Sequence, residues 1–587
     1  MCGIVGFVHH TPMGHCLLNT LRRLEYRGYD SSGMGVCLAN GELMRFRSLG
    51  SIEGLVSQVP SHLDALTGIG HTRWATHGVP SVHNAHPQAS ARILVIHNGT
   101  IMNYSALKHT LQEQGIIFES ETDTEVIAHL LEQAWTEDRS FAQAMACVLP
   151  LLEGSFALAC VVKDHPLELF FARQGTPPLI LGRGLQGYSL SSDALGLAGL
   201  VTDVMYIESG QWGQLHALHG LSLHQFTDQT HLTDPQWMPF SPPLIDHHQG
   251  GFDHFMRKEI SEQPDVIRRL IAWSGTCDLP NVLGQSTDHI TLVGCGTSYY
   301  AAWMGQYVLE STRPVRLELA SEFNGHKPVM IPGTTVALSQ SGETADTIQA
   351  MLYAKDMGQR LISVVNVEHS SLARLSHDVI PMQAGIEIGV ASTKAFIAQV
   401  WLMYALAGLQ SPAHLPEAME QTLALEPLIQ QWAFELSTKN SLLYLGRGLS
   451  YPIALEGALK MKELAYIHAE GLAGGELKHG SLALIDDDMP LILLLPSDDS
   501  FEKSLLSLCE IRARSGLVYV ITDPAGEQRL PKDLQLQGRL IVPHLPDARW
   551  QPLLHTLVLQ LLAYHTALYR GCSIDRPRHL AKSVTVE

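Results

Sequence analysis

Residues 290–298 read Ile290-Thr291-Leu292-Val293-Gly294-Cys295-Gly296-Thr297-Ser298, and the pattern returns 152 positions later as Leu442-Leu443-Tyr444-Leu445-Gly446-Arg447-Gly448-Leu449-Ser450. Each copy is a short apolar run followed by a G-x-G turn and a serine, which is typical of a buried parallel strand that leads into a helix. Later apolar runs recur at similar spacing: 336–338 against 491–493, and 361–365 against 517–521. A repeat of this length is too long for a solenoid and predicts two duplicated α/β domains with parallel sheets.

The sequence before this repeat has a different texture. Short β-type runs such as 93–96 and 156–162 are separated by Gly, Asn and Asp turns, with amphipathic stretches such as 123–133 between them, which predicts a layered α+β domain. Residues 227–251 are rich in proline and end in Gly250-Gly251, as a linker does. We expect an α+β domain over 1–225, a linker over 226–251, α/β domains over 252–430 and 431–577, and a C-terminal tail over 578–587.

Composition excludes several classes of protein. The chain has 587 residues and 39 Lys and Arg against 58 Asp and Glu, a net charge of −19, which disfavours nucleic acid or an anionic membrane as the main partner. Its nine cysteines are scattered without a C-x-x-C pair, which favours a reducing compartment and argues against a disulfide scaffold or a cysteine zinc site. No apolar run approaches the ~18 to 20 residues that span a bilayer, and the histidines lack metal-ligand spacing. We expect a cytoplasmic protein without a bound metal.

The N-terminus begins Met1-Cys2-Gly3. Removal of the initiator methionine would place the Cys2 thiol beside a free α-amine, whose pKa of about 8 suits a base. That is the N-terminal nucleophile arrangement. Taken alone, Cys2 fits a small buried residue that is second in the chain by chance better than it fits a nucleophile.

Four further stretches change the interpretation of Cys2. His71-Thr72-Arg73-Trp74-Ala75-Thr76-His77-Gly78 and Asn84-Ala85-His86-Pro87 supply a guanidinium, a hydroxyl and imidazoles, and an arginine can bind a carboxylate with two hydrogen bonds. His97-Asn98-Gly99 follows a strand, where a side-chain amide and a glycine N–H could form an oxyanion hole. The stretch 120–125 opens a helix and offers acids for a substrate ammonium.

Together and in this order, these motifs resemble the glutaminase domain of the class II, or N-terminal nucleophile, glutamine amidotransferases over roughly residues 1–220. The resemblance implies that Cys2 attacks the glutamine carboxamide while Asn98 and Gly99 stabilise the oxyanion. It also implies a gate for ammonia at Trp74 and a glutamine-binding set made up of Arg73, Thr76, His77, His86 and Asp123.

The two α/β copies differ in chemistry. The first carries Ser339-Gln340-Ser341-Gly342-Glu343-Thr344 after its next strand, whereas the second has Pro496-Ser497-Asp498-Asp499-Ser500. Hydroxyls, an amide and a glycine turn at the carboxyl edge of a parallel sheet suit an anion. A Walker loop and a dinucleotide fingerprint are both missing, so a small phosphorylated metabolite is the expected ligand.

These features resemble sugar isomerase domains of the phosphosugar-binding type. The resemblance implies that the phosphate and the sugar hydroxyls are held by Ser298, Ser339, Gln340, Ser341 and Thr344. It places Val390 and Ser392 in the same pocket.

The second copy supplies ionisable groups. Glu456, Lys460 and Glu463 fall at i, i+4 and i+7 and would share one helix face. Such a stripe usually faces solvent, but Gly474-Gly475-Glu476-Leu477-Lys478-His479-Gly480 follows closely. The patterned tail Leu580-Ala581-Lys582-Ser583-Val584 also suggests a docked functional segment.

The order of the domains and the tail resembles the isomerizing glutamine:fructose-6-phosphate aminotransferase family across nearly the whole chain. That family converts L-glutamine and D-fructose 6-phosphate into L-glutamate and D-glucosamine 6-phosphate, the first step of hexosamine biosynthesis, with no cofactor. By this resemblance His479 opens the sugar ring, Lys582 forms a Schiff base at C2, and Glu463 moves a proton between C1 and C2 with help from Lys460. Because the family contributes the counterpart of His479 across a subunit boundary, we expect a homodimer.

The sequence disfavours three alternative functions. An asparagine synthetase requires a pyrophosphatase loop that is missing from the sequence, and the match of 496–500 to a phosphoribosyl-pyrophosphate loop is superficial. A sensor that had lost its chemistry is disfavoured because Cys2 and Lys582 are both present. Ser481 and His579 depart from the usual residues of the family beside the expected sugar site, which leaves sugar selectivity open.

Overall fold

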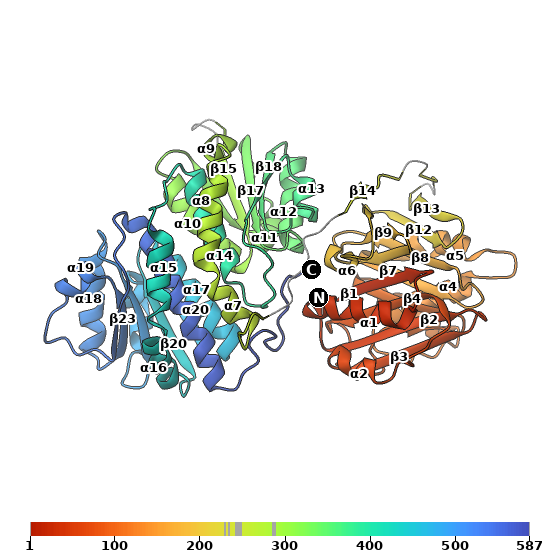
Figure 1. Cartoon of the computed structure of the whole chain (residues 1–587), viewed down its shortest axis with the longest axis horizontal. Helices are drawn as coiled ribbons and strands as arrows, with labels where there is room; N and C mark the ends of the chain where they lie inside the picture. Colours follow the sequence, from red (N-terminus) through yellow and green to blue (C-terminus); the bar gives the residue numbers. More distant parts are fainter. Residues whose placement is uncertain (1, 228–229, 233–234, 241–248, 285–288, 586–587) are drawn as a thin grey trace. The chain divides into compact units, whose positions relative to one another are not determined.

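The computed structural model describes residues 2–227, 230–232, 235–240, 249–284 and 289–585. The chain forms two compact units (Figure 1). Unit 1 comprises residues 1–246 together with 583–587, and unit 2 comprises residues 247–582. The domain boundaries predicted within these units remain predictions.

Unit 1 is built on two antiparallel sheets. The larger one has the order β14-β11-β9-β10-β1-β4-β2-β3, with strands β14 (Met238–Pro239), β11 (Asp203–Tyr206), β9 (Ile180–Gly184), β10 (Gly187–Ser191), β1 (Gly3–Val8), β4 (Ala65–Arg73), β2 (Ser31–Leu38) and β3 (Leu43–Leu49). The smaller one has the order β13-β12-β8-β7-β6-β5, with strands β13 (Gly220–Gln225), β12 (Gln211–His216), β8 (Glu168–Gln174), β7 (Gly154–Val162), β6 (Ile93–Ile101) and β5 (Gln88–Ala89).

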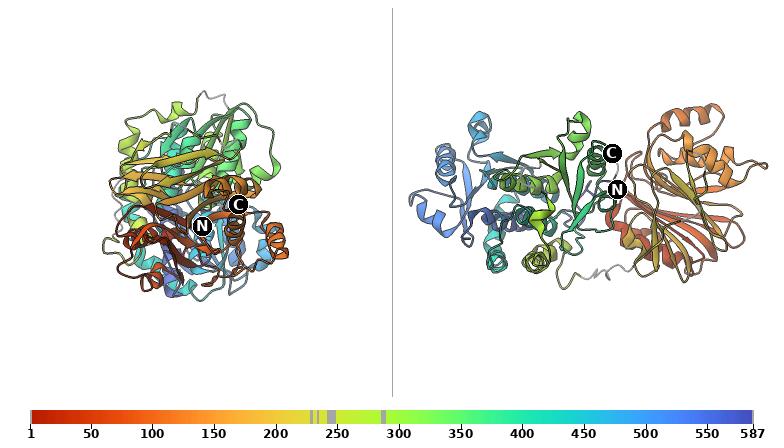
Figure 2. Two further views of the ribbon diagram at one scale, coloured as in Figure 1. Left: turned by 90° about the vertical axis from the view of Figure 1, so that its right-hand side faces the viewer. Right: turned by 90° about the horizontal axis from the view of Figure 1, so that it is seen from above.

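Strict alternation along the strands explains the layers of unit 1. In β1, Ile4 and Val8 belong to the core between the sheets, whereas Val5 and Phe7 pack with helix α1 (Met13–Leu24). In β6, Leu94 and Ile96 face the same inter-sheet core, and their neighbours face the helices α4 (Thr124–Ala134) and α5 (Phe141–Val148). Unit 1 therefore consists of two sheets that pack face to face, with helices on their outer sides (Figure 2).

The register of these strands brings the N-terminal motifs together. β1 pairs with β4 so that Gly3 lies opposite Thr72, which sets Cys2 beside Arg73 and Trp74 at the end of β4. β6 pairs with β7 through Asn98 and Gly99. Motifs about 70 and 95 positions after Cys2 therefore meet at one edge of the sandwich.

Unit 2 contains two five-stranded parallel sheets with the same topology. The first has the order β16-β15-β17-β18-β19, with strands β16 (Val315–Leu319), β15 (His289–Gly294), β17 (Gly333–Ser339), β18 (Arg360–Val365) and β19 (Asp378–Pro381). The second has the order β21-β20-β22-β23-β24, with strands β21 (His468–Ala473), β20 (Ser441–Gly446), β22 (Pro490–Leu495), β23 (Leu517–Thr522) and β24 (Gly538–Ile541). Numbered within each copy, both orders are 2-1-3-4-5, which confirms the predicted duplication.

The duplicated turn has one conformation in both copies. Gly296 and Gly448 both have φ of +52°, a region that favours glycine. The turns lead into α10 (Gly296–Leu309) and α17 (Ser450–Ala465), and α17 begins two positions later in its copy than α10 does.

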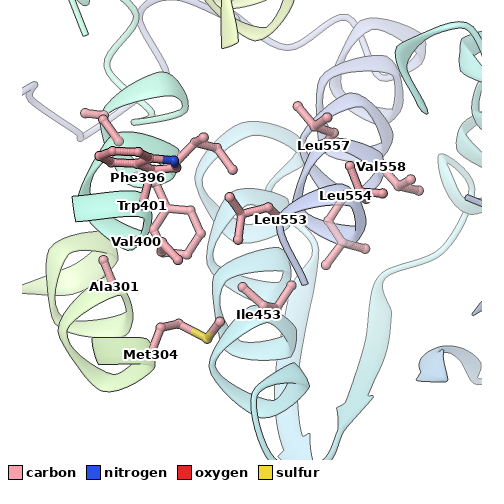
Figure 3. Packing of buried hydrophobic residues seen from close by; sticks show 14 of the residues in the cluster. Ala301, Met304, Phe396, Val400, Trp401, Ile453, Leu553, Leu554, Leu557 and Val558 are labelled. Atoms are coloured by element: carbon pink, nitrogen blue, oxygen red, sulfur yellow. The ribbon is translucent and has the colours of Figure 1, made fainter. Parts of the chain in front are cut away.

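One large hydrophobic cluster contains residues of both copies. Figure 3 shows Met304 of α10, Ile453 of α17, side chains of α14 (Lys394–Leu406) such as Trp401, and Leu553 and Leu557 of α20 (Gln551–Tyr569) in this packing. Of the 19 residues of α20, 17 are buried. Protein surrounds this helix, which explains why its apolar residues are not confined to one face.

The segment expected to be a linker is partly a strand. Met238–Pro239 forms β14, which pairs with β11 at the edge of the larger sheet, a position that tolerates proline. Residues 228–229, 233–234 and 241–248 of the expected linker lie outside the described residues. Across the described residues, no helix combines the length and the apolar character that crossing a membrane requires, and all nine cysteines are free thiols.

Candidate active sites

The Cys2 thiol of unit 1 lies against the backbone at the end of β4. Its Sγ accepts a hydrogen bond from Trp74 N at 3.2 Å and lies 3.4 Å from Trp74 O. Burial raises the pKa of this thiol, while the Trp74 N–H and the Arg73 guanidinium act in the opposite direction. The thiol is therefore held in place beside groups that favour the thiolate, which is the reactive form of cysteine.

Asn98 and Gly99 lie next to Cys2 on β6. Asn98 Nδ2 donates to Cys2 O at 3.0 Å, and Asn98 Oδ1 lies 3.2 Å from His71 Nε2. Gly99 has φ of +120°, and a Cβ added there would lie 2.0 Å from Ser155 O. Only glycine fits at this position, and the amide of Asn98 is oriented toward the cysteine.

Three buried histidines pack around Asn98, and we call them the histidine cluster: His71, His86 and His97. The rings of His71 and His86 lie 4.1 Å apart, and both His86 and His97 contact Thr124 Oγ1, at 2.8 and 3.0 Å. Burial lowers the pKa of His71 to about 3 and lowers the pKa values of His86 and His97 as well. The cluster is consequently neutral near pH 7 and orders the site without adding charge.

The predicted glutamine-binding residues surround one pocket. Arg73 donates to Gly78 O at 3.0 Å and to His77 O, and Asp123 accepts from Ile101 N at 2.9 Å. The lining consists of Cys2, Arg73, Trp74, Thr76, His77, His86, His97, Gly99, Thr122, Asp123 and Thr124. A guanidinium at one side and a carboxylate at another match the two charged groups of an α-amino acid.

Two contacts of this site were not predicted from the sequence. Arg27 Nε donates to Cys2 O at 3.4 Å, and Arg27 Nη1 pairs with Asp193 at 2.6 Å. Asp30 Oδ2 accepts from Ala75 N at 2.9 Å and fixes the loop after β4. Arg27 and Asp30 lie in a short connection with no motif spacing, so sequence pattern offered no signal for them.

In unit 2 the predicted phosphate-binding residues lie at the carboxyl edge of the first sheet. β15 and β17 are parallel neighbours, so the turns that follow them end at the same edge. Ser339 Oγ lies 3.1 Å from Thr344 Oγ1 and accepts from Gly342 N at 3.0 Å, while Ser341 Oγ accepts from Glu343 N at 3.1 Å. Gln340 lies in the same turn, and Ser298 Oγ accepts from Gln399 Nε2 at 2.9 Å. This edge lies at the topological switch point of a 2-1-3-4-5 sheet, where ligands bind.

The charged face of α17 is buried rather than solvated. Lys460 and Glu456 are each 1% exposed, and Lys460 Nζ lies 2.5 Å from Glu463 and 3.5 Å from Glu456. Lys460 Nζ also donates to Thr297 Oγ1 at 3.2 Å, a residue of the first copy's glycine turn. Burial, reinforced by Glu463, raises the pKa of Glu456 to about 7 although Lys460 opposes the shift. This network links the predicted acid–base groups of the second copy to the glycine turn of the first.

Lys582 is held in a buried ion pair in the tail of unit 2. Its Nζ lies 2.5 Å from Glu387 Oε2 and 2.8 Å from Gly389 O, and the lysine side chain is 4% exposed. Ser392 Oγ donates to the same carboxylate at 3.1 Å. Val390 is buried beside this cluster. Burial alone would raise the pKa of Glu387, but the ammonium of Lys582 and the surrounding N–H groups lower it to about 2.

His479 is placed differently from the other predicted catalytic residues. It ends the short helix η3 (Glu476–His479), is exposed, and within the described part of the chain makes no hydrogen bond or ion pair. Sequence analysis also missed Glu387, although an acid just before Gly389-Val390-Ala391-Ser392 was a usable signal. Among the described residues, no group of three or more His, Cys, Asp or Glu is arranged to hold a metal ion.

Comparison with known proteins agrees with this geometry. A family model for the glutamine amidotransferase domain matches residues 71–198, and a model for the SIS domain matches residues 285–409 and 435–570. The protein is thus an amidotransferase of the N-terminal nucleophile type joined to a pair of phosphosugar isomerase domains, as the fold class predicted from sequence.

Similarity to full-length proteins identifies the family more closely than the domain models do. The chain is 41% identical over 615 residues to glutamine–fructose-6-phosphate aminotransferase (isomerizing) of Brucella abortus, and 42% identical over 618 residues to that of Rhizobium leguminosarum, with 100% of each chain covered. The C-terminal domain of glucosamine-fructose-6-phosphate aminotransferase from Francisella tularensis is 36% identical, with a TM-score of 0.52, and the match covers 56% of this chain and all of that one. The chain belongs to the family of isomerizing glutamine–fructose-6-phosphate aminotransferases.

Proposed function

We propose that this enzyme transfers the amide nitrogen of L-glutamine to D-fructose 6-phosphate and isomerises the product to D-glucosamine 6-phosphate, with L-glutamate released. The observation that carries the proposal is the presence, in one chain, of a pocket around Cys2 and of a second unit that holds both a buried Lys582–Glu387 ion pair and a hydroxyl-rich turn at the carboxyl edge of a parallel sheet. Family membership supports the same reaction.

In the glutaminase half, Cys2 is the nucleophile. After removal of Met1, its own α-amine takes the thiol proton, and the thiolate attacks the carboxamide carbon. The α-ammonium then returns the proton to the amide nitrogen as the C–N bond breaks, which leaves a thioester and free ammonia. The Asn98 amide and the Gly99 N–H stabilise the oxyanion, and Arg73, Thr76, His77, His86 and Asp123 bind the amino acid. Water then releases glutamate, and Trp74 gates the ammonia.

In the isomerase half, the hydroxyls and the amide of the first copy bind the substrate phosphate and sugar oxygens: Ser298, Ser339, Gln340, Ser341 and Thr344. Val390 and Ser392 line the same pocket. His479 assists ring opening, and Lys582 forms an imine at C2 that ammonia displaces. Glu463 then moves a proton from C1 to C2, and Lys460 beside it stabilises the charge that develops. A carbonyl and an imine supply the electron sink for this sequence.

Two further features belong to the proposal. We infer a homodimer, because His479 is exposed in its own chain and a second copy would bring it to the site. We also infer a cytoplasmic location, which the nine free cysteines support. Dilution to monomers should abolish synthesis and leave glutaminase activity, whereas full synthesis by monomers would refute the dimer.

The experiment that tests the function measures both products. Purified enzyme with glutamine and fructose 6-phosphate should yield glutamate and glucosamine 6-phosphate, and Cys2→Ala should abolish both while fructose 6-phosphate is still isomerised. Glutamine-dependent synthesis by the Cys2→Ala variant would contradict the assignment of the nucleophile.

A further inference from the structure

Glu259, on α7 (Phe255–Ser261), is a buried acid that the proposed mechanism leaves without a role. Its side chain is buried, with a residue exposure of 2%, and its Oε1 accepts from Ile388 N at 2.5 Å and from Gly389 N at 3.2 Å. Its Oε2 is buried and, within the described part of the chain, accepts no hydrogen bond. Glu259 therefore clamps the two peptides that lie between Glu387 and the predicted sugar pocket.

The clamped peptide leads directly to Lys582. Gly389 donates its N–H to Glu259 and accepts from Lys582 Nζ through its carbonyl at 2.8 Å. A Cβ at Gly389 would lie 2.9 Å from Glu259 Oε2, so glycine is needed for this close approach. Glu387, which directly precedes Ile388, holds the other side of the loop. Its Oε1 accepts hydrogen bonds from Thr393 N at 2.9 Å and from Ala395 N at 3.0 Å.

Glu259 and Glu387 thus form a pair of buried carboxyls around one lysine. Burial and the neighbouring Glu387 raise the pKa of Glu259 to about 7, whereas the pKa of Glu387 is lowered to about 2. The other charges that face Glu259 are Lys582 and Lys394, and Lys394 is already paired with Glu262 at 2.7 Å. A buried carboxylate oxygen that accepts no hydrogen bond is energetically unfavourable. Oε2 of Glu259 is therefore the atom at which a proton is favoured.

We propose that Glu259 is a positioning residue for Lys582, which in its neutral form holds the Ile388–Gly389 peptide and leaves Glu387 as the single carboxylate that faces the lysine. This inference rests on the proposed function and adds to it. Asp575 fixes α7 from the C-terminal segment by accepting from Phe255 N and Met256 N, both at 2.9 Å, so the clamp has a rigid base.

The proton balance of imine formation explains why one carboxylate is needed rather than two. Lys582 first loses one ammonium proton to solvent, and its neutral amine adds to the C2 carbonyl. A nitrogen proton moves to the new oxygen, that oxygen takes up one proton from solvent, the C–O bond breaks, and water leaves a protonated imine whose charge the Glu387 carboxylate balances. A second carboxylate at Glu259 would instead hold Lys582 as its ammonium.

The test compares Glu259→Gln, Glu259→Ala and a matched surface change, Glu417→Gln, in the full-length enzyme with glutamine and fructose 6-phosphate. Gln keeps the acceptor for the two N–H groups and is neutral at every pH. The Glu417 side chain is 53% exposed on α15 (Leu415–Leu423) and lies 3.6 Å from Arg268 in an exposed ion pair. Glutaminase activity of Cys2 is recorded in parallel and is expected to stay unchanged in all three variants.

Wild-type synthesis is expected to decline as pH rises through about 7, because Glu259 then ionises, whereas Glu259→Gln lacks this decline. The ratio of Glu259→Gln to wild-type synthesis should therefore grow about tenfold per pH unit above 7. Glu259→Ala removes the acceptor for the Ile388 and Gly389 N–H groups, so kcat for synthesis should fall about 100-fold. Borohydride should then no longer trap fructose 6-phosphate on Lys582.

The inference is overturned if the pH profile of Glu259→Gln superimposes on that of the wild type, or if Glu259→Ala traps the sugar normally. Protection of each variant from heat by fructose 6-phosphate verifies that unit 2 is folded. A wild-type enzyme that makes no amino sugar under these conditions would refute the proposed function itself, which is a separate outcome.

Discussion

Replacement of Asn98 by alanine tests the oxyanion assignment with little disturbance of the fold. Asn98 is 3% exposed, and its amide makes two contacts, with Cys2 O at 3.0 Å and with His71 Nε2 at 3.2 Å. Each partner keeps another bond in the variant, since Arg27 Nε still donates to Cys2 O and His71 still reaches His97 O at 3.0 Å. The variant therefore leaves no buried group wholly unpaired.

The expected magnitude follows from these contacts. Each lost neutral hydrogen bond with a surviving alternative costs about 1 kcal/mol of stability. Removal of one oxyanion donor costs about 2.7 to 4 kcal/mol in the transition state, or about 10² to 10³ in kcat. The effect on the rate should clearly exceed the effect on folding.

The assay measures glutamate release from glutamine, with isomerisation of fructose 6-phosphate as the control activity. Asn98→Ala should lose 10² to 10³ in glutaminase kcat, to order of magnitude, with a small change in KM and with isomerisation intact. A loss smaller than about tenfold, or an equal loss of both activities, would refute the reasoning, because the first denies the oxyanion role and the second indicates a folding defect.

Three other outcomes are expected. Gly99→Ala should destabilise unit 1 by about 2 to 6 kcal/mol, because it combines a positive φ with overlap at Ser155 O. The control Gly115→Ala shares a positive φ but has open space around the added Cβ, so it should cost about 1 kcal/mol. Equal unfolding midpoints of the two variants would contradict the overlap. Lys582→Arg should keep the ion pair with Glu387 but lose borohydride trapping of the sugar, and any trapped adduct would place the imine elsewhere. In the folded protein the histidine cluster has pKa values below the usual 6.5, and that of His71 is about 3. The unfolded chain therefore binds protons first as pH falls, and unit 1 should lose stability between pH 6.5 and pH 3. Heat inactivation of glutaminase that is independent of pH between 7.5 and 5 would contradict this.

Local pattern was enough for much of unit 1 and for the duplication. The apolar runs at 93–96 and 156–162 are strands β6 and β7, and the repeated G-x-G turns lead into α10 and α17. These features depend on periodicity and turn chemistry that act over a few residues. The edge strand β14 was missed because it is held by pairing with β11, a contact that proline-rich composition does not reveal.

Tertiary contacts decided the parts of the sites that sequence could not supply. The stripe of Glu456, Lys460 and Glu463 has the spacing of a solvated helix face, and it is tertiary packing, which brings Thr297 of the first copy to Lys460 Nζ, that buries it. Glu259 lies 128 positions before Glu387, and nothing local links the two acids. Long-range burial determines which charges face one another, and the pKa values follow from that arrangement.

The central claim is that nitrogen passes from glutamine at Cys2 to a sugar phosphate bound at Lys582. The most direct measurement supplies glutamine labelled with ¹⁵N in the amide, fructose 6-phosphate and an excess of unlabelled ammonium, and follows the nitrogen by mass spectrometry. Glucosamine 6-phosphate should carry the label, with one labelled amino group for each glutamate formed. An unlabelled amino sugar, or glutamate formed with no amino sugar, would contradict it.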